Sequence, residues 1–335
     1  MANNKLLTFS SSPHIKNPRT TRQIMMHVCI ALLPACIMAV VYFGLPALFI
    51  ILVSLISAVL AEYIYLLITG KTTKEILAQF DCSSCVTGIL TALTLGPKTP
   101  LYIPVLASAF AIVVVKMLFG GTGNNLVNPA ITGRVFAFMS FTSILANAFV
   151  APSINSLVGG NTFSATTGAT TLTGIFTDGN LPTLSNLDLL LGTGLAGCIG
   201  ETCKVALLIG ALYLAIVGII NIGYPILCVV VTGLMTVCLN NLRFEYFLPS
   251  ILSGGLILGA FFMATDYTTS PNTTLGNIIY FALLGLITAV LRQATGIETF
   301  SFVLLLMNIT VPLLDKFILP KPFGYKKSKQ GGAKK

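Results

Sequence analysis

The sequence predicts an all-α polytopic membrane protein with about ten transmembrane helices. Of its 335 residues, 55% are hydrophobic and only 9% are charged, and the mean hydropathy is +0.91. A soluble domain carries about 25% charged residues, so this chain cannot cover its surface with groups that face water. Many of its Lys and Arg residues gather near the two ends, in "KNPRTTR" and "KPFGYKKSKQGGAKK". Basic tails of this kind are typical of cytoplasmic flanks of membrane spans, and they do not indicate a nucleic-acid partner.

Each transmembrane helix needs about 20 apolar residues. Ten segments come close to this length: 24–43, 46–69, 85–96, 101–119, 134–151, 187–219, 224–240, 249–265, 274–295 and 299–319. The third segment is short, and the sixth is long enough to be broken in two.

An even number of spans places both ends of the chain on one side of the membrane, and the basic tails place that side in the cytoplasm. The segment between the fifth and sixth spans then lies outside, and it contains no Lys or Arg. The predicted organisation is a cytoplasmic tail (1–23), a first membrane half (24–151), an extracytoplasmic loop (152–186), a second membrane half (187–319) and a basic cytoplasmic tail (320–335).

The two halves resemble each other weakly. "SAVLAEYIYLL" (57–67) resembles "AGCIGETCKVALL" (196–208), "VTGILTALTLGPKTP" (86–100) resembles "LSGGLILGAFFMATDYTTSP" (252–271), and "VVVKMLFGGTG" (113–123) resembles "AVLRQATG" (289–296). Two five-span halves insert in opposite orientations, which predicts an inverted repeat whose broken helices frame a site near mid-membrane. The alternative is that helices rich in small residues resemble one another by composition alone.

Ionisable residues within or beside spans are costly, so they are candidate functional residues. They are Glu62, Lys116, Arg134, Glu201, Lys204, Asp266, Arg292 and Asp315. Glu62 and Glu201 occupy corresponding positions of the repeat and are candidates for an ion pathway. Pairing across helices or snorkelling to the interface is the simpler interpretation for Lys204 and Asp315, which lie near span ends.

Two polar, glycine- or threonine-rich stretches predict breaks in membrane helices. "FGGTGNNLVNPA" (119–130) lacks the GK[ST] ending of a phosphate-binding loop, and its glycines and Asn-Pro fit a tight turn or a broken helix. "ATDYTTSPNTT" (264–274) has the same character, so we expect these two stretches to form the walls of one polar site.

Eight cysteines are present, and Cys82 and Cys85 form a CxxC in "DCSSC". A zinc or iron–sulfur site normally needs four thiolate or imidazole ligands, and the chain has two histidines. We therefore predict no metal site, and the role of this pair stays open.

The loop "SATTGATTLTG" (164–174) is uncharged and rich in hydroxyls. It is either a flexible connector or a segment whose threonine another enzyme modifies. "TGATT" resembles the site at which flavin mononucleotide (FMN) is joined to a threonine through its phosphate by a flavin transferase.

Five further motifs extend this resemblance over nearly the whole chain: "SPHI" (12–15), "FGGTGNNLVNPA" (119–130), "GCIGET" (197–202), "FFMATDYTTSP" (261–271) and "LLLMNITVPLLD" (304–315). In this order they resemble the family of D-type subunits of the Rnf ion-translocating electron-transport complexes, which is related to the B-type subunit of the sodium-pumping NADH:quinone reductase. The resemblance implies that Thr170 carries FMN as a phosphoester and that Thr167, Gly168 and Ala169 complete the motif.

The resemblance also implies a function. Such a chain is a flavin-carrying membrane subunit of an ion-translocating oxidoreductase that relays electrons between reduced ferredoxin and NAD and moves Na+ or H+. Riboflavin is a candidate second cofactor, the partners are other membrane and peripheral subunits, and the location is the cytoplasmic (inner) membrane of a prokaryote. The alternatives are a component like the B-type subunit of the quinone reductase, a ten-helix solute channel or carrier without flavin, and a scaffold without a cofactor.

Overall fold

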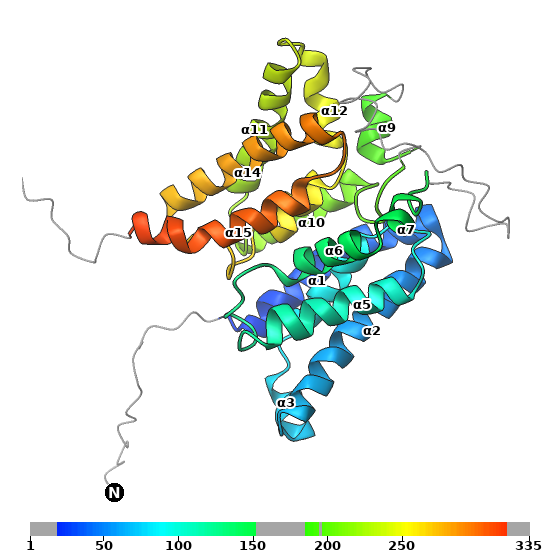
Figure 1. Ribbon diagram of the computed structural model, residues 1–335, viewed down its shortest axis with the longest axis vertical. Coiled ribbons are helices and arrows are strands. Elements are labelled where there is room, and N and C mark those ends of the chain that lie inside the picture. The colour runs from blue at the N-terminus through cyan, green and yellow to red at the C-terminus, as the bar shows by residue number, and fades with distance from the viewer. Residues whose placement is uncertain (1–18, 152–184, 194–195, 320–335) are drawn as a thin grey trace, which may run out of the picture.

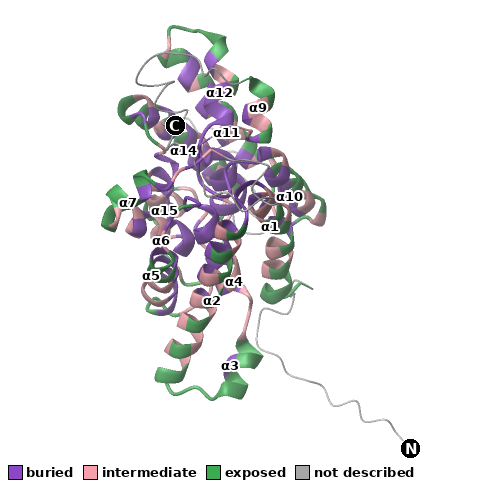
Figure 2. Ribbon diagram, turned by 90° about the vertical axis from the view of Figure 1, so that its right-hand side faces the viewer, coloured by how far each residue is buried: buried purple, intermediate pink, exposed green. Residues whose placement is uncertain are grey.

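The computed structural model describes residues 19–151, 185–193 and 196–319. Within these residues the regular secondary structure is helical, apart from one isolated antiparallel bridge between Val150 and Gly197. The predicted all-α class is confirmed. Buried residues concentrate in the middle of the molecule, and exposed residues lie on the outer faces and on α3 (Figure 2).

The first half begins with two long antiparallel helices. Thr20 and Gln23 form a capping box at the start of α1, and Gly44, with φ +68°, makes the tight turn into the next helix. The elements are α1 (Thr21–Phe43), α2 (Leu45–Ile68), α3 (Thr73–Gln79), α4 (Ser83–Leu93), α5 (Tyr102–Phe110), the π-helix η1 (Ala111–Met117), α6 (Pro129–Ser140) and α7 (Thr142–Ala146).

The second half follows a short helix, α9. Its elements are α9 (Asn186–Leu191), α10 (Lys204–Val217), α11 (Gly223–Leu239), the 3-10 helix η3 (Phe244–Tyr246), α12 (Phe247–Leu252), α13 (Leu256–Leu258), the π-helix η4 (Gly259–Met263), α14 (Thr274–Thr295) and α15 (Phe300–Phe317). The predicted long segment 187–219 is therefore divided into α9 and α10.

One predicted boundary is wrong. The span expected at 134–151 corresponds to α6, which begins at Pro129, and to the short α7. Asn128 caps α6 by accepting a hydrogen bond from the Ala130 N–H, and Pro129 suits the first turn of a helix because it has no N–H to satisfy. These signals place the start of the helix five residues before the predicted one.

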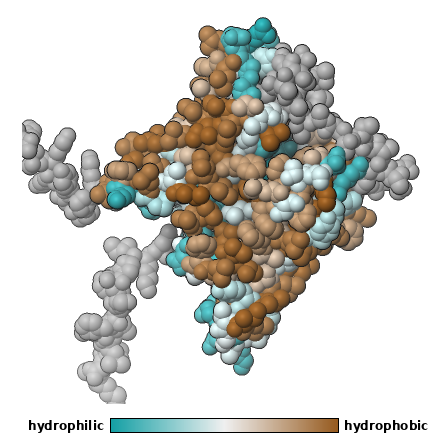
Figure 3. Space-filling model, viewed as in Figure 1, coloured by the Kyte–Doolittle hydropathy of each residue, from teal (hydrophilic) through white to brown (hydrophobic). Residues whose placement is uncertain are grey.

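The structure is that of a multi-pass membrane protein. Four described helices are long and apolar enough to span a membrane (α1, α2, α14 and α15), and the number is six if each bent helix pair is counted as one span. Shorter apolar helices cover Tyr102–Met117, Lys204–Val217 and Gly223–Leu239. Hydrophobic side chains cover most of one broad face of the molecule (Figure 3). The count of ten spans stays a prediction.

The first helices of the two halves run in opposite directions. Arg19 donates a hydrogen bond of 2.6 Å to the Val217 carbonyl, so the start of α1 lies beside the end of α10. At the other end of α1, Tyr42 donates at 2.8 Å to the carbonyl of Leu191, the last residue of α9, which precedes α10 in the chain. An inverted repeat requires this antiparallel relation.

In each half the third membrane segment is the broken one. α3 and α4 meet at a 70° bend, and η3–α12 and α13–η4 meet at a 67° bend. The red end of α15 lies at the left of Figure 1, and α7 and α9, which flank residues 152–184, lie at the right. The matching position of the two breaks agrees with the predicted duplication.

The packing of α1 on α10 depends on a glycine. A Cβ added at Gly210 would collide with the Ala31 carbonyl oxygen of α1. We predict that Gly210→Ala forces the two helices apart and lowers the free energy of unfolding by about 1–3 kcal/mol. Gly223→Ala is the matched control, since its nearest neighbour is the end of the Asn221 side chain at 3.3 Å. Thermal unfolding in detergent checks this, and equal midpoints for both variants would contradict it.

Candidate functional site

Thr170 and its motif residues Thr167, Gly168 and Ala169 lie outside the described residues. The structure does describe the residues on either side of that loop, and it describes the two helix breaks. A polar site lies at each break, and the two sites are built from the residues that the sequence singled out.

The first site is a hollow that is partly open to the outside, which we call the Lys116 pocket. One wall comes from Thr122, Asn125, Asn128, Pro129 and Ala130, and the facing wall from Phe261, Phe262, Thr265, Asp266, Tyr267 and Thr268. α1, α4 and the end of α10 complete it. The prediction that the stretches 119–130 and 264–274 face one site is confirmed.

Hydrogen bonds hold the two walls of the Lys116 pocket together. Asn128 donates from Nδ2 to the Met263 carbonyl at 3.0 Å, across the boundary between the halves. Asp266 accepts from the Thr268 hydroxyl at 2.8 Å, so its carboxylate is partly satisfied within its own loop. The buried Oδ1 of Asn125 has no protein partner, so an acceptor is left for a ligand.

Lys116 is the only Lys or Arg among the residues that line this pocket. Its side chain is 2% exposed, and Nζ donates to Glu62 Oε1 at 2.7 Å and to Ser83 Oγ at 2.6 Å. Asp81 Oδ1 lies 3.9 Å away. This ammonium is therefore neutralised by carboxylates before any ligand enters.

Glu62 also borders a second hollow, an apolar groove of about 800 Å³ between α2 and α3 that is lined by residues such as Leu60, Tyr63 and Leu77. Its Oε2 has no hydrogen-bond partner. The ion pair therefore lies between the two hollows: Lys116 lines the Lys116 pocket, and Glu62 lines the groove between α2 and α3.

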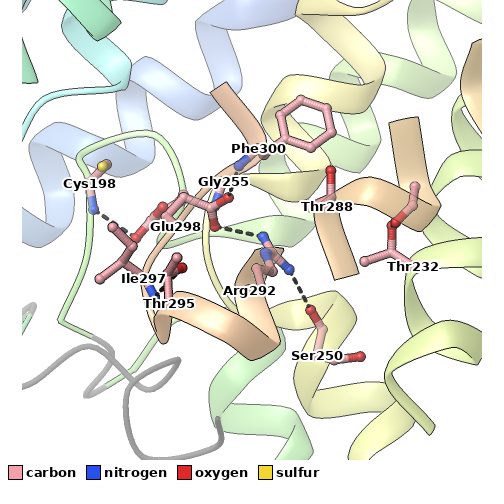
Figure 4. Close-up of polar contacts among 12 residues, drawn as sticks. Cys198, Thr232, Ser250, Gly255, Thr288, Arg292, Thr295, Ile297, Glu298 and Phe300 are labelled. Atoms are coloured by element: carbon pink, nitrogen blue, oxygen red, sulfur yellow. Dashed lines mark hydrogen bonds and ion pairs between the residues drawn. The ribbon is translucent and has the colours of Figure 1, made fainter. Parts of the chain in front are cut away.

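The second site surrounds the break before α13, and we call it the Glu201 cluster. It contains Glu201, Lys204, Arg134, Arg292, Glu298 and Cys198. Arg292, which is fully buried, donates to the Ser250 carbonyl at 3.0 Å and to Glu298 Oε2 at 2.6 Å (Figure 4). Glu298 also accepts from the N–H groups of Gly255 and Phe300. A Cβ at Gly254, which has φ +71°, would collide with Glu298, so the bend requires glycine there.

Glu201 lies in the segment between α9 and α10. Its Oε1 accepts from the Cys198 N–H at 2.9 Å, whereas its buried Oε2 has no partner. Lys204 is fully buried and donates to the Glu201 backbone carbonyl. The loop is fixed to the end of α4 because Ile199 and Gly200 donate their N–H groups to the carbonyls of Leu95 and Leu93.

Lys116 and Arg292 have equivalent positions and equivalent contacts in the two halves. Both follow an apolar run in the matching stretches 113–123 and 289–296, and each pairs with one glutamate at 2.6–2.7 Å. Each also bonds to a serine of the broken segment of its own half, Lys116 to the Ser83 hydroxyl and Arg292 to the Ser250 carbonyl.

The structure does not bring the two predicted glutamates together. Glu62 lies near the end of α2, the second segment of the first half, whereas Glu201 precedes α10, the first segment of the second half. The expectation that they occupy corresponding positions of the repeat is therefore wrong. Lys204 does not snorkel, since it is fully buried. Asp315 accepts from the Asn272 side chain at 2.8 Å, as the simpler interpretation expects.

Glu298 was not among the candidate functional residues that the sequence predicted. It lies between α14 and α15, just beyond Gly296, so it was not counted as a membrane residue. Its position six residues after Arg292 was the signal that could have indicated an ion pair between the two. Cys82 and Cys85 are free thiols, and no group of three or more His, Cys, Asp or Glu residues in the described chain is arranged to hold a metal ion.

Comparison with known proteins gives a consistent result over almost the full length. The model of the NQR2, RnfD, RnfE family matches residues 8–324. The D-type subunit of a Na(+)-translocating ferredoxin:NAD(+) oxidoreductase complex from Acetobacterium woodii is 38% identical over 326 residues, covering 97% of each chain. The D-type subunit of a proton-translocating ferredoxin:NAD(+) oxidoreductase complex from Clostridium ljungdahlii is 34% identical over 95% of this chain and 96% of its own. The D-type subunit of an ion-translocating oxidoreductase complex from Stutzerimonas stutzeri is 32% identical over 90% and 92%.

The Lys116–Glu62 pair yields a stability prediction. Lys116→Met leaves a carboxylate without its counter-charge in a buried place, and we expect a loss of about 3–5 kcal/mol. Glu62→Gln added to Lys116→Met removes that unpaired charge, so the double variant should be more stable than Lys116→Met alone. Lys71→Met, at an exposed lysine, is the control and should change little. Unfolding in detergent measures the cycle, and additive losses would contradict it.

Proposed function

The chain belongs to the NQR2, RnfD, RnfE family, and from this premise we propose that it is the flavin-carrying D-type subunit of an Rnf oxidoreductase. In this role it relays electrons between reduced ferredoxin and NAD and couples their flow to Na+ or H+ transport. The names of its relatives include both ions, so the family leaves the coupling ion open. The proposed location is a prokaryotic cytoplasmic (inner) membrane, with both termini in the cytoplasm because the basic tails favour that side.

We propose that Thr170 carries FMN as a phosphoester, added by a flavin transferase. The "TGAT" pattern of residues 167–170 supports this position. The loop leaves the described structure next to the Glu201 cluster, because Val150 pairs with Gly197 and α9 begins at Asn186. These contacts support a position for the flavin on the side opposite to the start of α1.

The Lys116 pocket fits a second flavin that has no phosphate. Its lining is mostly apolar and includes Phe261 and Phe262, as is typical of ligand pockets. Its single cation is already paired with Glu62, so the pocket offers no free charge for a phosphate. We propose riboflavin as its occupant, with Asn125 Oδ1 as an acceptor that has no protein partner. The Thr122 and Thr265 hydroxyls, which bond to Ser83 and to the Phe261 carbonyl, can still accept from a ligand.

The two positions lie at opposite ends of α10. Leu214 and Ile219 line the Lys116 pocket, whereas Glu201 and Lys204 stand at the start of the helix. Fourteen residues of α-helix span roughly 21 Å. A bound flavin supplies one- and two-electron transfer, and the protein's own part is to hold two flavins near the two membrane surfaces and to set their electrostatic surroundings.

The flavin assignment predicts a fluorescent band. The chain co-expressed with its transferase should fluoresce in a denaturing gel, because the bond to Thr170 is covalent. Thr170→Ala should abolish the signal, Thr171→Ala should keep at least part of it, and Thr170→Ser should retain some because the nucleophilic oxygen remains. The supernatant of the denatured protein should contain riboflavin. Undiminished fluorescence in Thr170→Ala would refute the assignment, and a colourless protein would favour a carrier or a scaffold.

We propose that Glu62 and Glu201 take part in ion movement. Glu62→Gln and Glu201→Gln should each impair ion uptake by the complex in vesicles. A pathway residue lowers the number of ions moved per electron, whereas a residue that acts on the cofactor lowers electron flow as well. Glu75→Gln, on the exposed side of α3, is the control. Normal uptake and electron flow in both variants would show that these charges are merely tolerated.

A further inference from the structure

The CxxC pair, Cys82 and Cys85, has no part in the proposed function. Both thiols are partly exposed, whereas Cys198, Cys203 and Cys228 are buried. A thiol must be accessible before it can react, so this pair is open to chemistry from which the three buried cysteines are protected.

The start of α4 places the two cysteines near each other. Cys82 is the N-cap residue, and Cys85 is the third residue of the helix. An ordinary N-cap side chain folds back over the third residue, which is how a serine there caps a helix. Cβ atoms three residues apart on a helix are about 5–6 Å apart, and a disulfide requires about 3.5–4.5 Å. A small local shift is therefore enough to join them.

The backbone of Cys82 is strained in a way that favours this shift. Its φ of +63° lies in the left-handed region, which costs a non-glycine residue about 1–2 kcal/mol. The residue stands at the 70° bend between α3 and α4, and its thiol makes no capping hydrogen bond. Rotation to the extended backbone that is usual for an N-cap relieves the strain and turns the side chain toward Cys85.

A third thiol belongs to the same region. Cys29 of α1 lies within range of electrostatic interaction with Cys82 and Cys85. Each of these three cysteines is the sequence neighbour of a residue that lines the Lys116 pocket: Val28, Ser83 and Val86. The thiols therefore stand directly behind one wall of that pocket, and Cys29 is a competing partner that a test must distinguish.

Ser83 connects the pair to the buried charges. Its hydroxyl accepts a hydrogen bond of 2.6 Å from Lys116 Nζ, which also pairs with Glu62 at 2.7 Å. Because Ser83 directly follows Cys82, a rotation of the Cys82 backbone displaces this hydroxyl. A bond between Cys82 and Cys85 therefore disturbs the position of the Lys116 ammonium.

We propose that Cys82 and Cys85 form a reversible disulfide that switches off electron transfer by the complex, the effect on activity resting on the proposed function. The oxidant is a small disulfide of the glutathione class. One cysteine thiolate attacks it and releases its first half as a thiolate, and the other cysteine thiolate then attacks the mixed disulfide and releases the second half. The two cysteine thiols lose two electrons and two protons, and the small disulfide becomes two thiols.

The test treats the purified, reduced complex with oxidised glutathione and then blocks the remaining thiols with N-ethylmaleimide. Peptide mass spectrometry should find the segment with Cys82 and Cys85 lighter by two hydrogen atoms and without maleimide, and dithiothreitol should reverse this. The same treatment should remove more than half of the ferredoxin-dependent reduction of NAD, again reversibly. Cys82→Ser and Cys85→Ser should stay active after oxidation, and a serine at the N-cap also keeps α4 capped.

Cys238→Ser, which removes an exposed thiol on α11, is the matched control and should be inhibited like the wild type. Cys29→Ser should still form the bond. A bond from Cys29 to either cysteine of the pair, glutathione adducts alone, or unchanged thiols would overturn this inference. So would a disulfide that leaves the activity unchanged, or inhibition that persists in Cys82→Ser and Cys85→Ser. A reduced wild-type complex that does not reduce NAD with ferredoxin overturns the proposed function instead, and the peptide masses then still decide whether the disulfide forms.

Discussion

A charge buried between membrane helices must be met within the protein, because lipid offers it no partner. This constraint governs both halves of the molecule. Lys116 and Arg292 each pair with a glutamate, and each also bonds to a serine of the broken helix pair in its own half. A helix break exposes polar groups that need partners: Arg292 donates to a backbone carbonyl at its break, and Lys116 donates to a serine hydroxyl at the other. The two breaks and the two basic residues therefore depend on each other.

Much of this arrangement could be predicted from local sequence. Apolar runs predicted most of the helices, and the glycine-rich and threonine-rich stretches predicted two facing walls, which meet in the Lys116 pocket. The start of α6 was placed too late because hydropathy ignores the cap that Asn128 provides. The partnership of Glu298 with Arg292 could not be predicted, since it depends on the bend at Gly254, which brings α12 and the α14–α15 turn together. Contacts of this kind are properties of the folded chain and leave no pattern in hydropathy.

The two sites differ in charge although they occupy related positions in the two halves. In the Lys116 pocket the lone cation is neutralised by Glu62, with Asp81 nearby, so an uncharged ring suits it. In the Glu201 cluster three cations lie among two carboxylates, and in the described part of the chain only one of the three, Arg292, forms an ion pair, with Glu298. A duplicated scaffold has thus produced two different environments through a few charged residues, while the helices that hold them kept the same order.

The Lys116–Glu62 pair also provides a physical route from electron flow to ion movement. Lys116 lines the pocket that we assign to the second flavin, and its partner Glu62 borders the groove between α2 and α3. If this pocket holds a flavin, its reduction would add negative charge beside Lys116, and that charge would compete with Glu62 for the same ammonium. Two unit charges about 4 Å apart interact by about 4 kcal/mol at an effective dielectric constant of 20, so a negative charge at such a distance from Lys116 would weaken its pairing with Glu62. Glu62 has an unpartnered oxygen, so it can take up Na+ or H+ when its hold on Lys116 weakens. On this argument one buried lysine transmits the redox state of the pocket to the ion site.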